Sequence, residues 1–357
     1  MFCDLPVEIM DMVFGYLKDG DKARLAQVNQ QLSQQFVYHS RNAFKQLICS
    51  DFSADELKVV VTLCGSNVTC IDIDANVSDS MIELIAMQCI NLDSGSFAIT
   101  DDNFNAIKGF LKRESIKSIK LNCVYQSHET DVFQYVHEYC KILKIEGFWM
   151  NHEQQIRHLI HLEELEVTSF DTLCTMDLGD FTLQCYYYPI GLELDVVYPE
   201  LTKLSIHILD SPITYRLYLP TCPQLKSLIL SCKQIEILNL EDVIAKYANT
   251  VESLVFEPKV VRAKSYARNI VRALRKCKNL LHVGSKNDII RVLFADYLAL
   301  FIYSLKEKGF STERRFALQG EDMDTDTDTE TPIAADQLKQ ELMNKVPDSE
   351  VWDLIKM

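Results

Sequence analysis

Eight Lys or Arg residues and no acidic residue lie between positions 259 and 278, although the whole chain of 357 residues has a net charge of −15. Arg268, Arg272 and either Arg275 or Lys276 recur at helical spacing, which predicts a basic stripe along one helix. Guanidinium groups bind carboxylate and phosphate through paired N–H donors, so the stripe is a candidate anion site for an acidic or phosphorylated target. A solvated helix face fits the same pattern equally well.

Histidine and cysteine are the next residues that could do chemistry. His158 and His161 lie one helical turn apart but lack a third ligand at metal-binding spacing, and the twelve cysteines form no C-x-x-C pair. We therefore expect no metal site. Cys residues instead stand three positions before a leucine in four places, where a small buried apolar side chain suits the corner between a helix and a strand. These four are Cys89, Cys140, Cys222 and Cys277.

Motifs that would indicate catalysis are missing from the sequence. There is no Gly-rich phosphate loop, no G-x-S-x-G turn and no H-E-x-x-H, and only eleven glycines are present to build such sites. No feature selects a particular Cys–His pair as a nucleophile and its base. We expect a protein that is not an enzyme and that needs no cofactor.

Composition limits the partners and the compartment. A net charge of −15 disfavours nucleic acid and acidic membranes, which both attract a positive surface. The longest mainly apolar run, from Leu293 to Leu305, is interrupted by Asp296 and is too short to cross a bilayer. The first residues lack the basic start and apolar core of a signal peptide, so we expect reduced thiols in the cytoplasm, the nucleus or both.

The first forty residues predict a small helical module. Pro6 suits a first helical turn with Asp4 as N-cap, and the polar stretch around Gly20 is expected to end the first helix. Apolar residues follow at helical spacing on both sides of this break: Ile9, Val13, Phe14 and Leu17, then Leu25, Val28, Leu32 and Phe36. So few large apolar groups bury too little surface to be comfortably stable alone, which implies a partner.

Much of the remaining chain repeats one pattern, apolar-x-x-apolar-x-apolar, mostly at intervals of 22 to 29 residues. The alternating end of the pattern predicts a short strand with one buried face, and segments of helical periodicity lie between the copies. The copies are Val68-Ile71-Ile73, Ile116-Ile119-Leu121, Leu162-Leu165-Val167, Leu178-Phe181-Leu183, Leu201-Leu204-Ile206, Leu225-Leu228-Leu230 and Val251-Leu254-Phe256, with weaker ones at Phe97-Ile99, Leu143-Ile145 and Leu280-Val283. Each unit leaves an apolar side bare, so the units must stack. Another α/β domain with parallel strands is the alternative.

Two parts of this chain resemble known families. Leu5-Pro6-x-Glu8-Ile9, then Val13-Phe14-x-x-Leu17, then Leu25-x-x-Val28 resembles an F-box, which docks on the Skp-type adaptor of cullin–RING ubiquitin ligases. One departure is Leu32, because F-boxes usually carry a Trp near this position. Over about residues 4–309 the chain resembles an F-box/leucine-rich-repeat protein.

That resemblance implies an α/β fold, in which a short N-terminal helical F-box precedes a curved leucine-rich-repeat solenoid with parallel strands on the concave side and helices on the convex side. The implied domains are an F-box at 1–47, a linker or solenoid cap at 48–67, repeats at 68–309, and an acidic disordered tail with a short terminal helix at 310–357. We expect the small apolar end around Trp352 to dock on the last repeat or on a partner, because an exposed Trp is costly.

The resemblance also implies a function: a substrate receptor of an SCF-type ubiquitin ligase, which binds the adaptor and, through it, a cullin–RING ligase, and so directs a target to proteasomal degradation. The expected adaptor-binding residues are Leu5, Pro6, Ile9, Val13, Leu17, Leu25 and Val28. The expected target-binding residues are Lys120, Lys144, Glu166, Lys203, Ser205, His207, Ile229, Arg268 and Arg272. If the strand register is right, side chains such as Glu164, Ser227 and Ser231 also face outward. The alternative is a non-catalytic interaction scaffold with a degenerate F-box.

Acidic residues dominate positions 320–331 and almost no apolar residue interrupts them, so we expect this stretch to be disordered. Because it is tethered close to the basic stripe, it is a competing occupant for that stripe.

Overall fold

The computed structural model describes residues 5–41, 44–123, 132–148, 156–170, 190–191, 196–209, 217–232, 240–258, 263–321, 335–347 and 349–357. The chain divides into two compact units, one made of Met1–Phe148 with Gln155–Leu162 and the other of Trp149–Gln154 with Glu163–Met357. Each unit is α/β, with helices and parallel strands that alternate along the chain.

The first unit begins with three helices, α1 (Val7–Tyr16), α2 (Asp19–Ala26) and α3 (Gln30–Ser40). The predicted break after the first helix is present, but it lies at Leu17 and Lys18, and Gly20 itself lies inside α2. The Asn29 side chain caps α3 by accepting from the Leu32 N–H at 2.9 Å, which separates the second predicted pattern into two helices. The predicted cap Asp4 lies outside the described residues.

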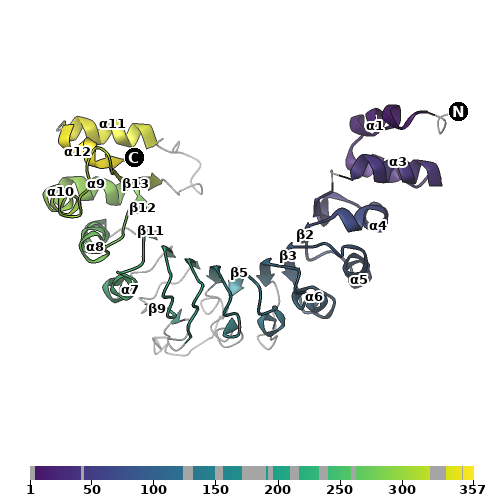
Figure 1. The fold of residues 1–357 in the computed structure, drawn as a ribbon, viewed down its shortest axis with the longest axis horizontal. Coiled ribbons are helices and arrows are strands. Elements are labelled where there is room, and N and C mark those ends of the chain that lie inside the picture. The colour runs from purple at the N-terminus through teal and green to yellow at the C-terminus, as the bar shows by residue number, and fades with distance from the viewer. Residues whose placement is uncertain are drawn as a thin grey trace, which may run out of the picture. The chain divides into compact units, whose positions relative to one another are not determined.

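Five strands of the first unit form a parallel sheet in chain order. They are β1 (Gln46–Ile48), β2 (Cys70–Ile73), β3 (Ser94–Ile99), β4 (Ser118–Cys123) and β5 (Ile142–Phe148). Three helices connect the first four strands, and Figure 1 shows them on one side of the sheet. They are α4 (Ala54–Cys64), α5 (Asp79–Gln88) and α6 (Phe104–Leu111). Short 3₁₀ turns are η1 (Cys49–Asp51), η2 (Gly65–Asn67) and η3 (Phe133–Tyr135).

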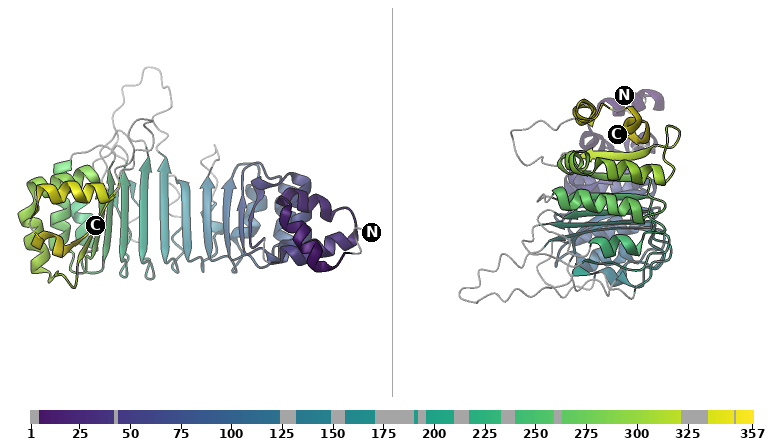
Figure 2. Two further views of the ribbon diagram at one scale, coloured as in Figure 1. Left: turned by 90° about the horizontal axis from the view of Figure 1, so that it is seen from above. Right: turned by 90° about the vertical axis from the view of Figure 1, so that its left-hand side faces the viewer.

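Seven strands of the second unit are also parallel, in the order β6-β8-β10-β11-β12-β13-β14, and Figure 2 shows strands of this unit lying side by side. They are β6 (Glu164–Phe170), β8 (Lys203–Leu209), β10 (Ser227–Cys232), β11 (Ser253–Pro258), β12 (His282–Lys286), β13 (Phe316–Glu321) and β14 (Ile355–Lys356). The helices are α7 (Leu240–Lys246), α8 (Ala263–Lys276), α9 (Asn287–Asp296), α10 (Leu298–Glu307), α11 (Ala335–Lys345) and α12 (Ser349–Leu354). A separate pair joins β7 (Ile190–Gly191) to β9 (Leu217–Tyr218).

Strand register confirms the predicted repeat pattern for the described copies except Phe97-Ile99, which is displaced by two residues because Phe97 aligns with Ile73 and Leu121. Ile71, Gly95, Ile119 and Leu143 are aligned across the first sheet, and Leu204, Leu228 and Leu254 across part of the second. The apolar members of these described copies are buried. The copy at Leu178-Phe181-Leu183 lies outside the described residues.

The weaker copies have a packing explanation. Gly95 occupies the central strand position because the Phe97 ring fills its space: a Cβ on Gly95 would approach the Phe97 ring to 2.4 Å. In the copy that contains Leu143, Cys140 itself occupies the first apolar position of the pattern, three residues before Leu143. Cys89, Cys222 and Cys277 instead each lie three residues before the first apolar position of their own copy. All four cysteines are buried, as predicted, but they do not mark one repeat position.

The parallel sheets extend beyond the predicted repeat range of 68–309. Residues 46–47 of the predicted F-box module and residue 48 of the predicted linker already pair with β2, and residues 316–321 and 355–356, assigned to the tail, pair as β13 and β14. Helix α4 likewise lies in the predicted linker. One of the segments of helical periodicity between copies does not form an α-helix in its described part: between β4 and β5, residues 132–140 form only the 3₁₀ turn η3.

The C-terminal residues pack on an earlier helix of the second unit, α9. Trp352 stacks on Phe294 with ring centroids 5.6 Å apart, and its Nε1 donates to the Val346 carbonyl at 2.9 Å. The Arg291 guanidinium pairs with Glu341 at 3.1 Å, which ties α9 to α11. The prediction that the apolar end packs on the last repeat is therefore confirmed.

Basic side chains bind the corners where a helix ends and the chain turns toward the next strand. Arg113 Nη1 donates to the Cys89 carbonyl at 2.9 Å, and its Nη2 donates to the Ala86 carbonyl. Burial lowers the pKa of Arg113, so the carbonyl partners compensate a partly desolvated cation. Lys308 makes the same contact with the Cys277 carbonyl at the end of α8, and Lys246 donates to the Leu219 carbonyl, which follows β9.

Candidate functional site

The seven predicted adaptor-binding residues lie on α1 and α2 and directly beside these two helices, and none of them is buried. Leu5, Val13, Leu17 and Leu25 are half-buried, and Pro6 is exposed. Ile9 keeps 44% of its surface accessible and Val28 keeps 67%. The structure therefore leaves these apolar side chains available to a partner.

Their neighbours in sequence form the core of the helices instead. Phe14 is fully buried, with its ring centroid 5.8 Å from Phe36 and 5.5 Å from His39. The other buried residues of this core are Met10, Ala23, Ala26, Leu32 and Phe36. Phe14 was predicted to share one stripe with Ile9 and Val13, but the helix turns it inward and leaves the others outside.

Two large apolar residues of the outward face of α1 were missed from the sequence. Met12 is 59% exposed and Tyr16 is 86% exposed. Together with Ile9 they have the spacing i, i+3, i+7, which places three side chains on one side of a helix. That spacing is a readable signal, and it adds two large side chains to the apolar face between Ile9 and Leu17.

The N-terminal helices are tied to the rest of the first unit at two places. Arg24 Nη2 lies 2.6 Å from Glu56 Oε1, which links α2 to α4, and the Phe36 ring lies 5.8 Å from Phe44. Glu56 also closes a capping box with Ser53, and the backbone hydrogen bond from Ser53 is the main cause that lowers the pKa of Glu56. We call the outward apolar residues Leu5, Pro6, Ile9, Met12, Val13, Tyr16, Leu17, Leu25 and Val28 the N-terminal face.

Predicted target-binding residues of the first unit lie on the sheet face opposite the helices. Lys120 and Lys144 are cross-strand neighbours on β4 and β5, and both are half-buried. Lys120 Nζ lies 2.8 Å from Glu146 Oε1. This surface therefore carries paired charges of both signs.

The corresponding face of the second unit carries the other predicted strand residues. Lys203 Nζ lies 3.3 Å from Glu164 Oε2, and His207 Nε2 lies 3.9 Å from Glu166 Oε1. Ile229 lies on the same row of side chains as Glu166 and is half-buried. Salt bridges between partly exposed groups contribute little to stability, so these pairs are free to exchange partners with a bound target.

Two serines of this face are less accessible than predicted. Ser205 and Ser231 were expected to face outward and be accessible, but only 2% of Ser205 is exposed and Ser231 is also buried. Their cross-strand neighbours are larger; Glu166 and Ile229 flank Ser205. In a parallel sheet these longer side chains cover a serine between them, so Ser205 and Ser231 are inaccessible to a target. Ser227 remains half-buried.

The predicted basic stripe lies on α8. Arg268 and Arg272 are both exposed, and Arg272 Nη1 pairs with Glu241 Oε1 of α7. Arg275 and Lys276 are exposed in the last turn of the same helix. The competing acidic residues 322–330 lie outside the described residues.

The buried cysteines are unsuited to chemistry. Burial raises the pKa of Cys89 and Cys277 to about 11, and that of Cys140 and Cys222 to about 12. A thiol with such a pKa has almost no reactive thiolate near neutral pH.

Within the described part of the chain, no group of three or more His, Cys, Asp or Glu side chains is placed to hold a metal ion. His158 Nε2 instead contacts the Val136 carbonyl at 2.7 Å, and His161 stacks on Tyr139.

None of the helices in the described ranges combines the length and the apolar character needed to cross a bilayer. A scan against protein-family models finds no match to this chain, and a search of curated proteins finds no similar sequence.

Proposed function

We propose that this chain is the substrate-recognition subunit of an SCF-type ubiquitin ligase, in which the N-terminal face binds the Skp-type adaptor and the leucine-rich repeats capture a target. The observation that carries the proposal is how the apolar residues among the first forty divide between the buried core and the accessible surface. Their seven predicted contact residues all stay out of the core, while Phe14 and Phe36 between them hold the helices together. An exposed apolar helical surface of this kind is suited to a helical partner.

The repeats complete the proposal. Parallel strands present charged side chains such as Lys120 and Lys203, which are half-buried and so remain accessible to a target. A receptor of this type needs no catalytic residue of its own, because the complex holds a target lysine near the ubiquitin carrier and accelerates transfer by proximity.

Co-purification tests the proposal. Tagged wild-type chain should retain both the Skp-type adaptor and a cullin, and a Leu5→Ala, Pro6→Ala variant should lose both. A Met87→Ala, Ile90→Ala variant is the matched control, because these residues are also large, apolar and exposed but lie at the end of α5. Undiminished recovery of adaptor and cullin with the Leu5, Pro6 variant would refute the proposal.

A non-catalytic interaction scaffold is the second candidate, and Leu32 is the observation that favours it. Leu32 is buried against the other N-terminal helices, so it adds no area to the N-terminal face at the position where an F-box usually has a Trp. A scaffold would co-purify with its partners but without a cullin, and the same experiment therefore separates the two candidates.

A further inference from the structure

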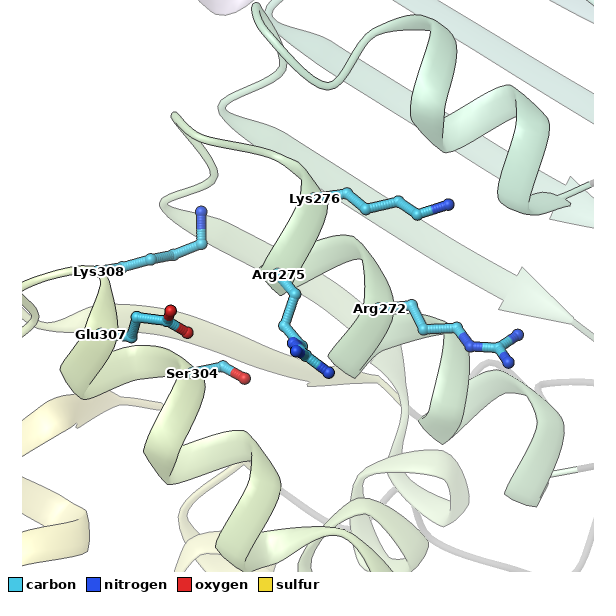
Figure 3. Close-up of a pocket in the computed structure, with 6 residues that line it drawn as sticks. All are labelled: Arg272, Arg275, Lys276, Ser304, Glu307 and Lys308. Carbon is cyan, nitrogen blue, oxygen red and sulfur yellow. The ribbon is translucent and has the colours of Figure 1, made fainter.

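A cavity of about 480 Å³ lies between α8 and α10 of the second unit (Figure 3). Its lining consists of Arg272, Arg275, Lys276, Ser304, Glu307 and Lys308. Figure 3 shows that Arg275 reaches toward α10, where Ser304 and Glu307 lie, while Arg272 and Lys276 extend away from that helix. The volume falls within the range of about 300–1,000 Å³ that is typical of ligand sites.

Four cations and one carboxylate line this cavity, and not all of the positive charge is neutralised. Arg272 is paired with Glu241, and the Lys308 ammonium donates to the Cys277 carbonyl, which carries no formal charge. Among the described residues, neither Arg275 nor Lys276 forms an ion pair. Glu307 can offset only one of the remaining three positive charges.

Helix dipoles explain part of this arrangement but not all of it. Arg275 and Lys276 end α8, and Lys308 directly follows α10, so each group lies near the partial negative charge of a helix C-terminus. Each helix end contributes roughly half an elementary charge, so two ends offset about one cation. After Glu307 and both helix ends are counted, the cavity retains about one positive charge.

Apolar side chains beside the cavity indicate a peptide rather than a free ion. Leu300 and Tyr303 of α10 are 41% and 60% exposed, and their spacing places them on the same helix face as Glu307. Lys308 is half-buried, so this end of α10 is partly shielded from water, which strengthens local electrostatic attraction. The same burial lowers the pKa of Lys308. A long polyanion would meet the repulsion of a chain with net charge −15.

We propose that this cavity binds one phosphorylated side chain of a target peptide, with an apolar neighbour of that side chain packed on Leu300 and Tyr303. Arg275 supplies a guanidinium fork for the phosphate, and Lys276 and Lys308 add positive charge around it. Because it names the class of target, this inference rests on the proposed function. It differs from the sequence prediction, since Arg268 does not line the cavity and Arg272 is already paired.

Fluorescence anisotropy with the purified full-length chain tests the inference at low salt. The probe is a labelled nine-residue peptide that contains one phosphoserine followed by leucine, and the unphosphorylated peptide and inorganic phosphate are compared with it. An Arg275→Glu, Lys276→Glu variant should bind the phosphopeptide at least tenfold more weakly. An Arg268→Glu, Lys278→Glu variant has the same change in charge on exposed residues outside the cavity and should stay within twofold of the wild type.

Three results would overturn the proposal: equal losses in the two variants, equal affinity for both peptides, or inorganic phosphate bound as tightly as the phosphopeptide. A chain whose aspartates at 322, 324, 326 and 328 are changed to asparagine tests the competing occupant. If only that chain bound the probe, the occupant would be the chain's own acidic segment, and binding of a partner peptide would be refuted. The assay contains no adaptor, so loss of adaptor binding in the co-purification experiment leaves its outcome unaffected.

Discussion

Ile9→Ala together with Val28→Ala should leave the stability of the N-terminal helices nearly unchanged, whereas Phe14→Ala should destabilise them strongly. Burying a whole Ile or Val side chain contributes about 1.5–3 kcal/mol, but Ile9 and Val28 keep 44% and 67% of their surface accessible in the free chain. Truncating both therefore costs about 1 kcal/mol, and the better helix propensity of Ala at position 9 offsets about 0.4 kcal/mol of that. Phe14 is fully buried, and its truncation should cost about 3–5 kcal/mol.

Hydrogen exchange followed by mass spectrometry measures these costs where they arise. Amides of α1, α2 and α3 should exchange at nearly the wild-type rate in the Ile9, Val28 variant. In Phe14→Ala, the free energy of opening of the same helices should fall by the amount estimated above. Amides of α8, in the second unit, serve as the internal reference in both variants. Equal loss of protection in the two variants would show that Ile9 and Val28 belong to the folding core, and the N-terminal face would not be free for a partner.

Two further predictions concern stability. Arg113→Met should lower the free energy of unfolding by about 1–3 kcal/mol, because the Cys89 and Ala86 carbonyls lose charged donors. Arg113→Lys should lower it by less. Urea unfolding of the two variants measures both changes, and a Met variant as stable as the wild type would contradict the prediction. Glu56 has a lowered pKa in the folded chain, so its contribution to stability is present above its unfolded pKa of about 4.3 and is lost as pH falls through the folded pKa. Glu56→Gln should therefore flatten the dependence of the urea midpoint on pH below about 5, and an unaltered dependence would rule out this role.

The strand pattern could be predicted from the sequence because period-2 alternation and a repeat of about 24 residues report burial directly. Gly95 and Cys140 weakened two copies, since a neighbouring Phe97 ring replaces the missing side chain in one and a cysteine replaces an aliphatic residue in the other. The ends of the sheets were missed for a related reason. β1 and β14 are only three and two residues long, too short for alternation to be visible.

Exposure within the predicted site was harder to predict. The spacing of Ile9, Val13 and Phe14 allows one wide apolar stripe, and only packing against Phe36 shows that Phe14 turns inward. Burial of Ser205 depends on the lengths of its neighbours on two other strands, which a single strand's pattern does not contain. The cavity between α8 and α10 joins residues from two helices, so spacing along α8 alone pointed to Arg268 instead of Lys308.

Titration of the purified Skp-type adaptor against the full-length chain tests the central claim most directly. We expect the wild type to bind and the Ile9→Ala, Val28→Ala variant to bind about tenfold or more weakly, because each side chain can still bury about 1 kcal/mol of apolar surface against a partner. The Met87→Ala, Ile90→Ala control should match the wild type. A wild-type chain that does not bind the adaptor, or a variant that binds it as tightly as the wild type, would contradict the proposal that the N-terminal face is an adaptor-binding surface.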